Sequence, residues 1–193
     1  MQKRILEVVD YDPQWVESYL EESLGIQQAL KGLNIRMHHI GSTSVPGLMA
    51  KPVIDILIET SNVSELDAYD GVMEAIGYLP RGEFGIPGRR FYLKGLINRT
   101  HHIHAFNFDT SDVVRHIAFR DYLIANQSVA AEYGALKSEL AVTCNNDNDT
   151  YCDGKEEFVQ HHERKALAWR ACKQGGSSEP HTRPDGGKVV QLP

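Results

Sequence analysis

Hydroxyl-bearing residues follow a glycine in one short segment of the chain. The segment starts at Gly41 and continues with Ser42, Thr43 and Ser44. Glycine lets the backbone approach a ligand closely, and hydroxyls and main-chain N–H groups donate hydrogen bonds to phosphate oxygens. No Gly-Lys-Ser/Thr ending follows, so the segment is not a Walker loop. We therefore expect a phosphate-binding turn of another type, to which the preceding His39 is hydrogen-bonded.

A single aspartate, Asp55, interrupts the apolar run that comes next. In a strand every second side chain shares a face, so the isoleucines at 54, 56 and 58 face the core and Asp55 faces away from them. A buried carboxylate needs hydrogen bonds, an ionic partner or a metal. Two readings stay open: an aspartate satisfied by loop N–H groups, and a ligand for Mg²⁺ or Mn²⁺ facing a triphosphate in the hydroxyl-rich loop.

Three histidines occur within four residues, at 101, 102 and 104, in a predicted strand. His102 and His104 face the same way. Together with Asp55 they would form a two-histidine, one-carboxylate set, which suits Zn²⁺, Mn²⁺ or Fe²⁺ better than Mg²⁺. His104 is equally a candidate general base, because imidazole titrates near neutral pH. Histidines that are merely hydrogen-bonded on a short strand are the remaining alternative.

Basic residues suited to phosphate oxygens lie in several segments. We take Lys51, Arg90, Arg120 and Lys155 as candidates, because a triphosphate site needs positive charge. Structural roles compete with this interpretation. Arg120 is adjacent to Asp121 and would form an ion pair with it, and Lys155 precedes two glutamates on a solvated face.

The sequence from His39 to Asp55 resembles the signature of the GrpB family, a largely uncharacterised family assigned to the nucleotidyltransferase superfamily. Further similar motifs occur at residues 99–104, 119–123, 133–137 and 151–158, so the resemblance covers roughly residues 7–170. It implies a nucleotidyltransferase-like fold in which the Gly-Ser turn and the following helix hold phosphates. It also implies that acidic residues hold Mg²⁺ on a nucleoside triphosphate, and that His104 or His102 replaces a third carboxylate.

The chain departs from the superfamily pattern at position 57, where Leu57 stands in place of a second acid. Glu59 shares the face of Asp55, but four strand residues separate the two carboxylates by roughly 13 Å. The resemblance thus implies transfer of a nucleotidyl group from a nucleoside triphosphate to an unknown small acceptor, and Leu57 leaves turnover open.

Two other functions remain open at this point. One is a non-catalytic nucleotide-binding or folding-accessory module linked to nucleotide or coenzyme metabolism, in keeping with the family's fusion, in some bacteria, to dephospho-CoA kinase. The other is a metal-dependent hydrolase that uses the histidines and Asp55.

The elements that position these residues follow from periodicity and helix boundaries. We expect an α/β (α+β) fold: a mixed sheet flanked by helices, with a helical C-terminal part. Its predicted strands cover residues 35–40, 53–59, 90–93 and 102–106. Its predicted helices cover residues 12–32 and 64–76, a segment from 111 onward, 129–142 and 154–172. Residues 1–173 would form one domain, and the Gly-, Ser- and Pro-rich residues 174–193 a disordered tail.

Composition narrows the class of protein. The 193 residues are 41% hydrophobic and 24% charged, which argues against a disordered, collagen-like or membrane-spanning chain. A net charge of −6 disfavours a general nucleic-acid binder. Three cysteines without a Cys-x-x-Cys pair disfavour a disulfide framework. With neither a signal peptide nor a membrane span expected, we expect a cytoplasmic location.

Overall fold

The computed structural model describes residues 6–175 and contains a five-stranded mixed sheet of order β1-β2-β5-β4-β3. Strands β2 and β5 are parallel, and the other neighbouring pairs are antiparallel. The strands are β1 (Ile35–Ile40), β2 (Ile54–Thr60), β3 (Tyr78–Pro80), β4 (Arg90–Lys94) and β5 (His101–Asn107). The helices are α1 (Gln14–Ala29), η1 (Ser42–Ser44), η2 (Val63–Tyr69), α2 (Asp70–Ala75), α3 (Ser111–Ala125), α4 (Gln127–Thr143) and α5 (Asn148–Gly175). The predicted mixed sheet flanked by helices, with a helical C-terminal part, is confirmed.

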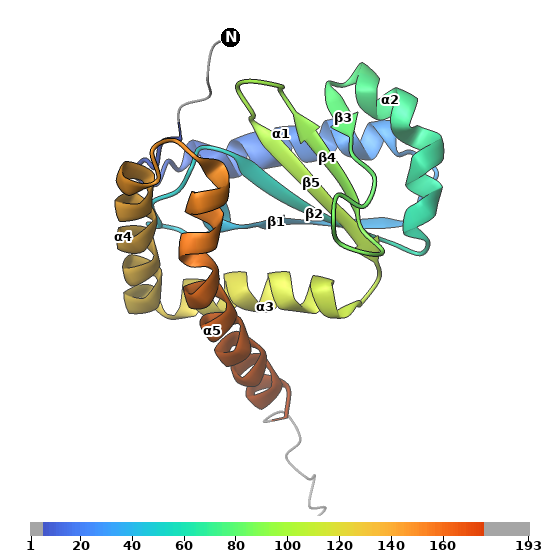
Figure 1. Cartoon of the computed structure of the whole chain (residues 1–193). Coiled ribbons are helices and arrows are strands. Elements are labelled where there is room, and N and C mark those ends of the chain that lie inside the picture. Colours follow the sequence, from blue (N-terminus) through green and yellow to red (C-terminus); the bar gives the residue numbers. More distant parts are fainter. Residues whose placement is uncertain (1–5, 176–193) are drawn as a thin grey trace, which may run out of the picture.

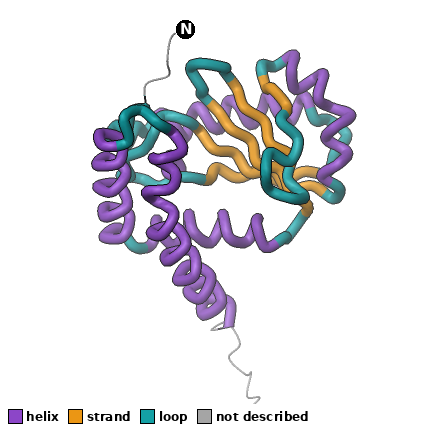
Figure 2. Tube along the Cα trace, viewed as in Figure 1, coloured by secondary structure: helices purple, strands orange, loops and turns teal. Residues whose placement is uncertain are grey.

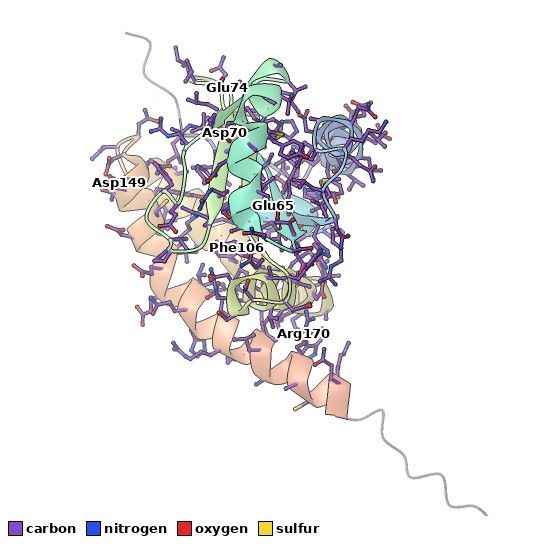
Figure 3. The ribbon with its side chains drawn as sticks, turned by 90° about the vertical axis from the view of Figure 1, so that its right-hand side faces the viewer. Glu65, Asp70, Glu74, Phe106, Asp149 and Arg170 are labelled. Atoms are coloured by element: carbon purple, nitrogen blue, oxygen red, sulfur yellow. The ribbon has the colours of Figure 1, made fainter. Side chains whose placement is uncertain are left out.

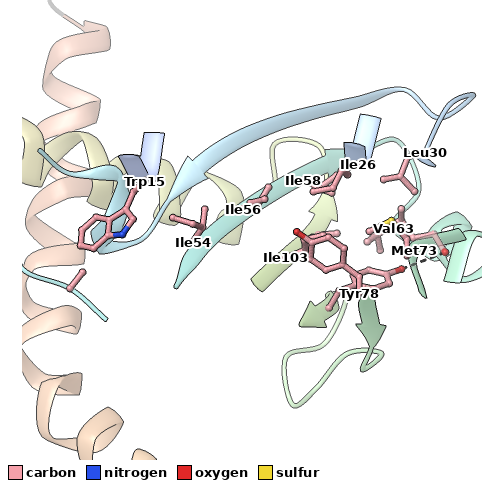
Figure 4. Close-up of a cluster of buried hydrophobic side chains, with 14 residues drawn as sticks. Trp15, Ile26, Leu30, Ile54, Ile56, Ile58, Val63, Met73, Tyr78 and Ile103 are labelled. Carbon is pink, nitrogen blue, oxygen red and sulfur yellow. Dashed lines mark hydrogen bonds between the residues drawn. The ribbon is translucent and has the colours of Figure 1, made fainter. Parts of the chain in front are cut away.

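Helices cover both faces of the sheet (Figure 1). On one face, the isoleucines at 54, 56 and 58 of β2 pack against α1 and the η2–α2 segment, where Ile26 and Met73 are completely buried (Figure 4). On the other face, Leu57 packs against Val113 of α3. The alternation of β2 therefore buries the isoleucine face in the main core, as expected, and turns Asp55 toward the α3 side.

The last two helices pack beside the loop at 41–51 rather than over the centre of the sheet (Figures 1 and 2). Val45 and Leu48 of this loop form a buried cluster with Ala130 and Tyr133 of α4. In the side view, Asp149 lies at the sheet end of α5 and Arg170 toward its other end (Figure 3). This arrangement brings α4 and α5 to the edge of the face that carries Asp55.

The helix expected over residues 64–76 is replaced by a 3₁₀ helix, η2, followed by the short helix α2. The buried residues Val63 and Leu66 and the partly buried Tyr69 recur every three residues, which is the period of a 3₁₀ helix. The cap of η2 is Asn62, whose side chain accepts from the Ser64 N–H, so the segment begins before Ser64.

The boundaries of the C-terminal part also differ from expectation. Helix α5 begins at Asn148, because Asp147 accepts from the N–H of Thr150 and caps the first turn. Gln174 and Gly175 belong to α5, and the remainder of the predicted tail lies outside the described residues. Within residues 6–175, the structure contains no helix with the length and apolar character needed to cross a membrane.

Candidate functional site

A pocket of about 730 Å³ lies where the loop at 41–51, the sheet and the C-terminal helices meet. It brings together most of the residues singled out in the sequence: Gly41, Ser42, Thr43, Lys51, Asp55, His102, His104 and Lys155. Ser44, Arg90 and Arg120 do not line it. The candidate residues thus converge from four separate segments of the chain.

Gly41 connects β1 to the hydroxyl-rich turn in a conformation reserved for glycine, with φ 71° and ψ −172°. A Cβ on this residue would lie 2.5 Å from Oδ2 of Asp55. The glycine is therefore required both for the backbone turn and for the close approach of the loop to the carboxylate.

Side chains brace the turn from within. The Ser44 hydroxyl donates to the Gly41 carbonyl at 2.6 Å, which gives Ser44 a structural role. His39 Nε2 lies 3.0 Å from the Thr43 hydroxyl, so the expected hydrogen bond to the loop is present, and the His39 ring stacks on Tyr19. Burial lowers the pKa of His39 to about 4, so it is neutral near pH 7.

The parallel pairing of β2 and β5 sets Asp55 directly beside His102. His102 Nδ1 lies 3.2 Å from Asp55 Oδ1, and His104 Nε2 lies 3.7 Å from the same oxygen. Burial alone would raise the pKa of Asp55, but the two histidines outweigh it and hold that pKa well below its usual range. An ionised carboxylate accepts hydrogen bonds only, so His102 donates from Nδ1. In the neutral ring the lone pair then lies on Nε2, which is buried and without a hydrogen-bond partner among the described residues.

Arg89 determines the tautomer of His104 through a contact with Nδ1, the ring nitrogen that does not face Asp55. Its Nη1 lies 3.4 Å from His104 Nδ1, and because a guanidinium has no acceptor, Nδ1 must accept. His104 therefore carries its proton on Nε2, which faces Asp55. In this arrangement His104 is a hydrogen-bond donor, which leaves His102, with its buried Nε2, as the candidate base.

The residues do not fit a metal centre as they stand. Among the described residues that line the pocket, Asp55 is the sole carboxylate, and Leu57 is completely buried where a second acid was sought. The nitrogens of His102 and His104 point at the Asp55 oxygen instead of surrounding a common point. Across residues 6–175, no group of three or more histidine, cysteine or acidic side chains is arranged to hold an ion. The Mg²⁺, Mn²⁺ and Zn²⁺ predictions therefore stay predictions.

Three lysine amines line the helical side of the pocket around two tyrosine rings. Nζ of Lys51 and Nζ of Lys155 each lie 5.0 Å from the centre of the Tyr151 ring. Nζ of Lys137 lies 4.5 Å from the centre of the Tyr133 ring. These are cation–π distances, so each amine lies against the face of one of the two aromatic rings.

Lys137 is a functional candidate that the sequence analysis does not predict, although it ends the motif at residues 133–137. Its side chain is 2% exposed, and its amine donates to the Met49 carbonyl. Burial, reinforced by the charge of Lys155, lowers the pKa of Lys137 to about 7. Its spacing from Tyr133 was a signal, but its position within a predicted helix gave no reason to place the amine in a buried site.

Arg89 and Arg99 line the pocket in place of Arg90. Arg90 lies on the opposite face of β4, where its guanidinium binds Asp67 at 2.5 and 2.8 Å. Nε of Arg99 is buried without a hydrogen-bond partner in the described chain, so it is available to an anion.

Arg120 supports the turn from behind the pocket. Its Nη1 donates to the His39 carbonyl at 3.0 Å, and its guanidinium pairs with Asp121, as the structural alternative predicted. The contact ties α3 to the end of β1 directly before Gly41.

Comparisons with known proteins place the chain among close relatives. UPF0157 protein YqkA of Bacillus subtilis (strain 168) is 40% identical over 168 residues, which cover 87% of this chain and 49% of YqkA. The chain thus spans about half the length of YqkA. The crystal structure of conserved protein GrpB from Enterococcus faecalis matches with a TM-score of 0.82 and 42% identity, covering 86% of this chain and 99% of that one.

A weaker likeness is to the structure of Cid1. The structure of Cid1 in complex with the UTP analogue UMPNPP matches 67% of this chain and 40% of the Cid1 chain, with a TM-score of 0.45 and 9% identity. This likeness is too low to support an inference about function. The family model described as GrpB protein, by contrast, matches residues 5–165. With that match and these relatives, the chain belongs to the GrpB family.

Proposed function

We propose that the pocket binds the polyphosphate of a nucleoside triphosphate and transfers its nucleotidyl group to a hydroxyl of a small acceptor. The observation that carries the proposal is the charge of the lining: four cationic side chains, from Lys51, Arg89, Arg99 and Lys155, the buried amine of Lys137, which titrates near pH 7, and one carboxylate. A chain with a net charge of −6 concentrates positive charge here, as recognition of a polyanion requires.

The lysines supply the phosphate contacts in this proposal. Lys51, Lys137 and Lys155 face the pocket from the loop, α4 and α5, and the main chain of Ser42 and Thr43 adds N–H donors. An amine is a compact point charge that suits phosphate oxygens approaching from several directions. The three lysines therefore favour a di- or triphosphate over a single phosphate group.

Asp55 and His102 supply the proton transfer. Entry of the acceptor must first uncover the buried Nε2 of His102. This nitrogen then accepts the proton of the acceptor hydroxyl as the acceptor oxygen bonds to the α-phosphorus, and Asp55 stabilises the resulting imidazolium at Nδ1. The bond between the α-phosphorus and the bridging oxygen breaks, and pyrophosphate leaves toward the lysines. Mg²⁺ or Mn²⁺, which the resemblance implies, enters this proposal as a condition of the test.

Nucleotide binding without turnover is the second candidate. Leu57 favours it, because the side chain at this position is fully buried and supplies no second acid. The two candidates share the same pocket and differ in whether pyrophosphate is released.

Thermal unfolding with each nucleoside triphosphate and with tripolyphosphate, with and without Mg²⁺ or Mn²⁺, tests the binding. At about 100 times the Kd a ligand adds roughly 2.7 kcal/mol, which raises the Tm by a few degrees for a protein of this size. Lys155→Met reduces the shift, whereas the matched variant Lys173→Met, whose amine contacts Trp169, retains it. The absence of a shift with any triphosphate would refute both candidates.

Pyrophosphate release distinguishes the candidates. Release by the wild type that Asp55→Asn abolishes, with binding retained, supports transfer. A Tm shift without release under any metal condition supports the binding module. A shift that requires the metal and disappears in Asp55→Asn would show that Asp55 holds an ion after rearrangement of the site.

A further inference from the structure

An exposed aromatic ring, that of Phe84, lines the pocket on the side away from the lysines. Phe84 lies in the loop between β3 and β4 and is 55% exposed. Its φ is 45°, in the left-handed region that phenylalanine rarely adopts. A large apolar side chain held in an unfavourable backbone conformation and still exposed to solvent does little for the fold, and this combination points to a role in binding.

The loop is built to hold this ring in place. The Arg89 guanidinium, 6% exposed, donates from Nη2 to the Phe84 carbonyl at 2.6 Å and from Nε to the Glu83 carbonyl at 3.1 Å. One face of the Phe84 ring stacks on Phe91, with ring centres 5.1 Å apart and planes 12° apart. Phe91 in turn contacts the ring of His104 at 5.2 Å. The Phe84 ring is thus fixed relative to the proposed reaction centre.

We propose that Phe84 is a stacking platform for the nucleobase of the bound nucleotide. This inference rests on the proposed function, and it assigns the two ends of the pocket: the lysines bind the phosphates, and Phe84 with Phe91 behind it binds the base. Every base offers a flat π-face, so stacking on this ring is tolerant of base identity. The exposed Arg81 guanidinium lies 5.5 Å from the centre of the Phe84 ring. This contact is weak because it is exposed to solvent, so a bound base displaces the guanidinium or inserts between it and the ring.

Titration calorimetry with ATP and with tripolyphosphate, a probe without a ring, tests the platform in the full chain. Phe84→Gly removes the ring, and glycine suits the positive φ, so relief of backbone strain offsets the lost stack on Phe91 and the Tm without ligand changes little. In this variant the Kd for ATP rises about tenfold or more, in line with the loss of one base–aromatic stack, and the Kd for tripolyphosphate does not change. Phe84→Tyr retains the wild-type Kd for ATP.

Fluorescence gives a direct reading of stacking. The triphosphate of 2-aminopurine riboside is quenched when its base stacks, so we expect quenching by the wild type and by Phe84→Tyr, and none by Phe84→Gly. Leu96→Ala, a change at a 77% exposed residue outside the pocket lining, leaves the quenching intact.

The outcomes separate the two proposals. Equal Kd values of wild type and Phe84→Gly for ATP would overturn the platform, as would a parallel loss of ATP and tripolyphosphate binding. Equal affinity of the wild type for ATP and tripolyphosphate would overturn the platform while leaving the phosphate site in place. If the wild type bound neither probe, the proposed function and the platform would both fall.

Discussion

At the scale of single residues, Gly41 and Asp55 act as a matched pair. The loop comes so close to the carboxylate that a Cβ at position 41 would lie 2.5 Å from Asp55 Oδ2. Asp55 in turn binds His102 and faces His104 across the same sheet surface. The smallest side chain of the turn thereby determines how the loop and the two histidines share one carboxylate.

Gly41→Ala tests this pairing. The substitution combines backbone strain of about 1–3 kcal/mol with an overlap on Asp55, so we expect a loss of about 3 kcal/mol in the free energy of unfolding. Gly47→Ala is the control, because Gly47 also has a positive φ, 79°, but a Cβ there would meet nothing within 4 Å. It loses about 1–2 kcal/mol from the backbone alone. Equal losses in urea unfolding would contradict the close approach.

Lys137 makes stability depend on pH in a predictable direction. Its pKa is about 7 in the folded protein and near 10.4 in an unfolded chain. Between these values the unfolded state binds more protons, so the free energy of unfolding rises with pH and levels off outside this window. Within this window a single group raises the free energy of unfolding by at most about 1.4 kcal/mol for each pH unit.

The variant Lys137→Met removes this contribution. We expect the slope of unfolding free energy against pH between 7 and 10 to be smaller in Lys137→Met than in the wild type, and unchanged in Lys173→Met. The comparison with wild type removes the contributions of tyrosines and cysteines that titrate in the same range. A slope identical in all three proteins would show that the buried amine keeps an ordinary pKa.

At the scale of elements, the contact between α4 and α5 positions the lysines. Gly154 of α5 packs so closely on Leu140 of α4 that an added Cβ would overlap its Cδ2 atom. Lys137 lies one turn before Leu140, and Lys155 directly follows Gly154. The separation of these two amines therefore depends on a helix contact that requires a glycine.

Gly154→Ala pushes the two helices apart, and overpacking of this kind costs about 1–3 kcal/mol. Gly71→Ala in α2 is a control, because a Cβ there meets nothing within 4 Å and alanine favours a helix by about 0.5–1 kcal/mol. We expect Gly154→Ala to lower the Tm and to weaken tripolyphosphate binding, and Gly71→Ala to do neither. An unaltered Kd in a destabilised Gly154→Ala would show that the lysines adjust independently of the helix contact.

The sequence predicts elements well where one period dominates and poorly where the signal is three-dimensional. Alternation in β2 correctly placed Asp55 opposite the isoleucines. The period of three in η2 was mistaken for a helix. The choice of Arg90 over Arg89 was off by one position, because the phase of β4 depends on its pairing with β5 and not on its own residues. Lys137 was not predicted as a site residue, because its burial comes from α5 and from the loop at 41–51, which lie elsewhere in the sequence.

At the scale of the whole molecule, the pocket lies between two structural halves of the described chain. One half consists of the turn and strands β2, β4 and β5, which supply Gly41, Asp55 and the two histidines and hold Phe84 in place. The other half consists of α4 and α5, which supply Lys137 and Lys155. A small cluster of buried hydrophobic side chains centred on Val45 and Leu48 packs the two halves against each other beside the pocket. A polyphosphate bound to the lysines and to the turn would add a further connection between them, so ligand binding should stabilise both halves.

Hydrogen exchange measured by mass spectrometry tests this connection. We expect saturating tripolyphosphate to slow exchange along α4 and α5 as well as in residues 41–51, because local opening of either helix would break its contacts with the anion. Helix α2, which packs on the opposite face of the sheet, serves as the internal reference and should change no more than the global stability does. In Lys137→Met the added protection of α4 should disappear while that of residues 41–51 persists. Protection restricted to residues 41–51 in the wild type would mean that the anion binds the turn alone and that the helical half takes no part in recognition.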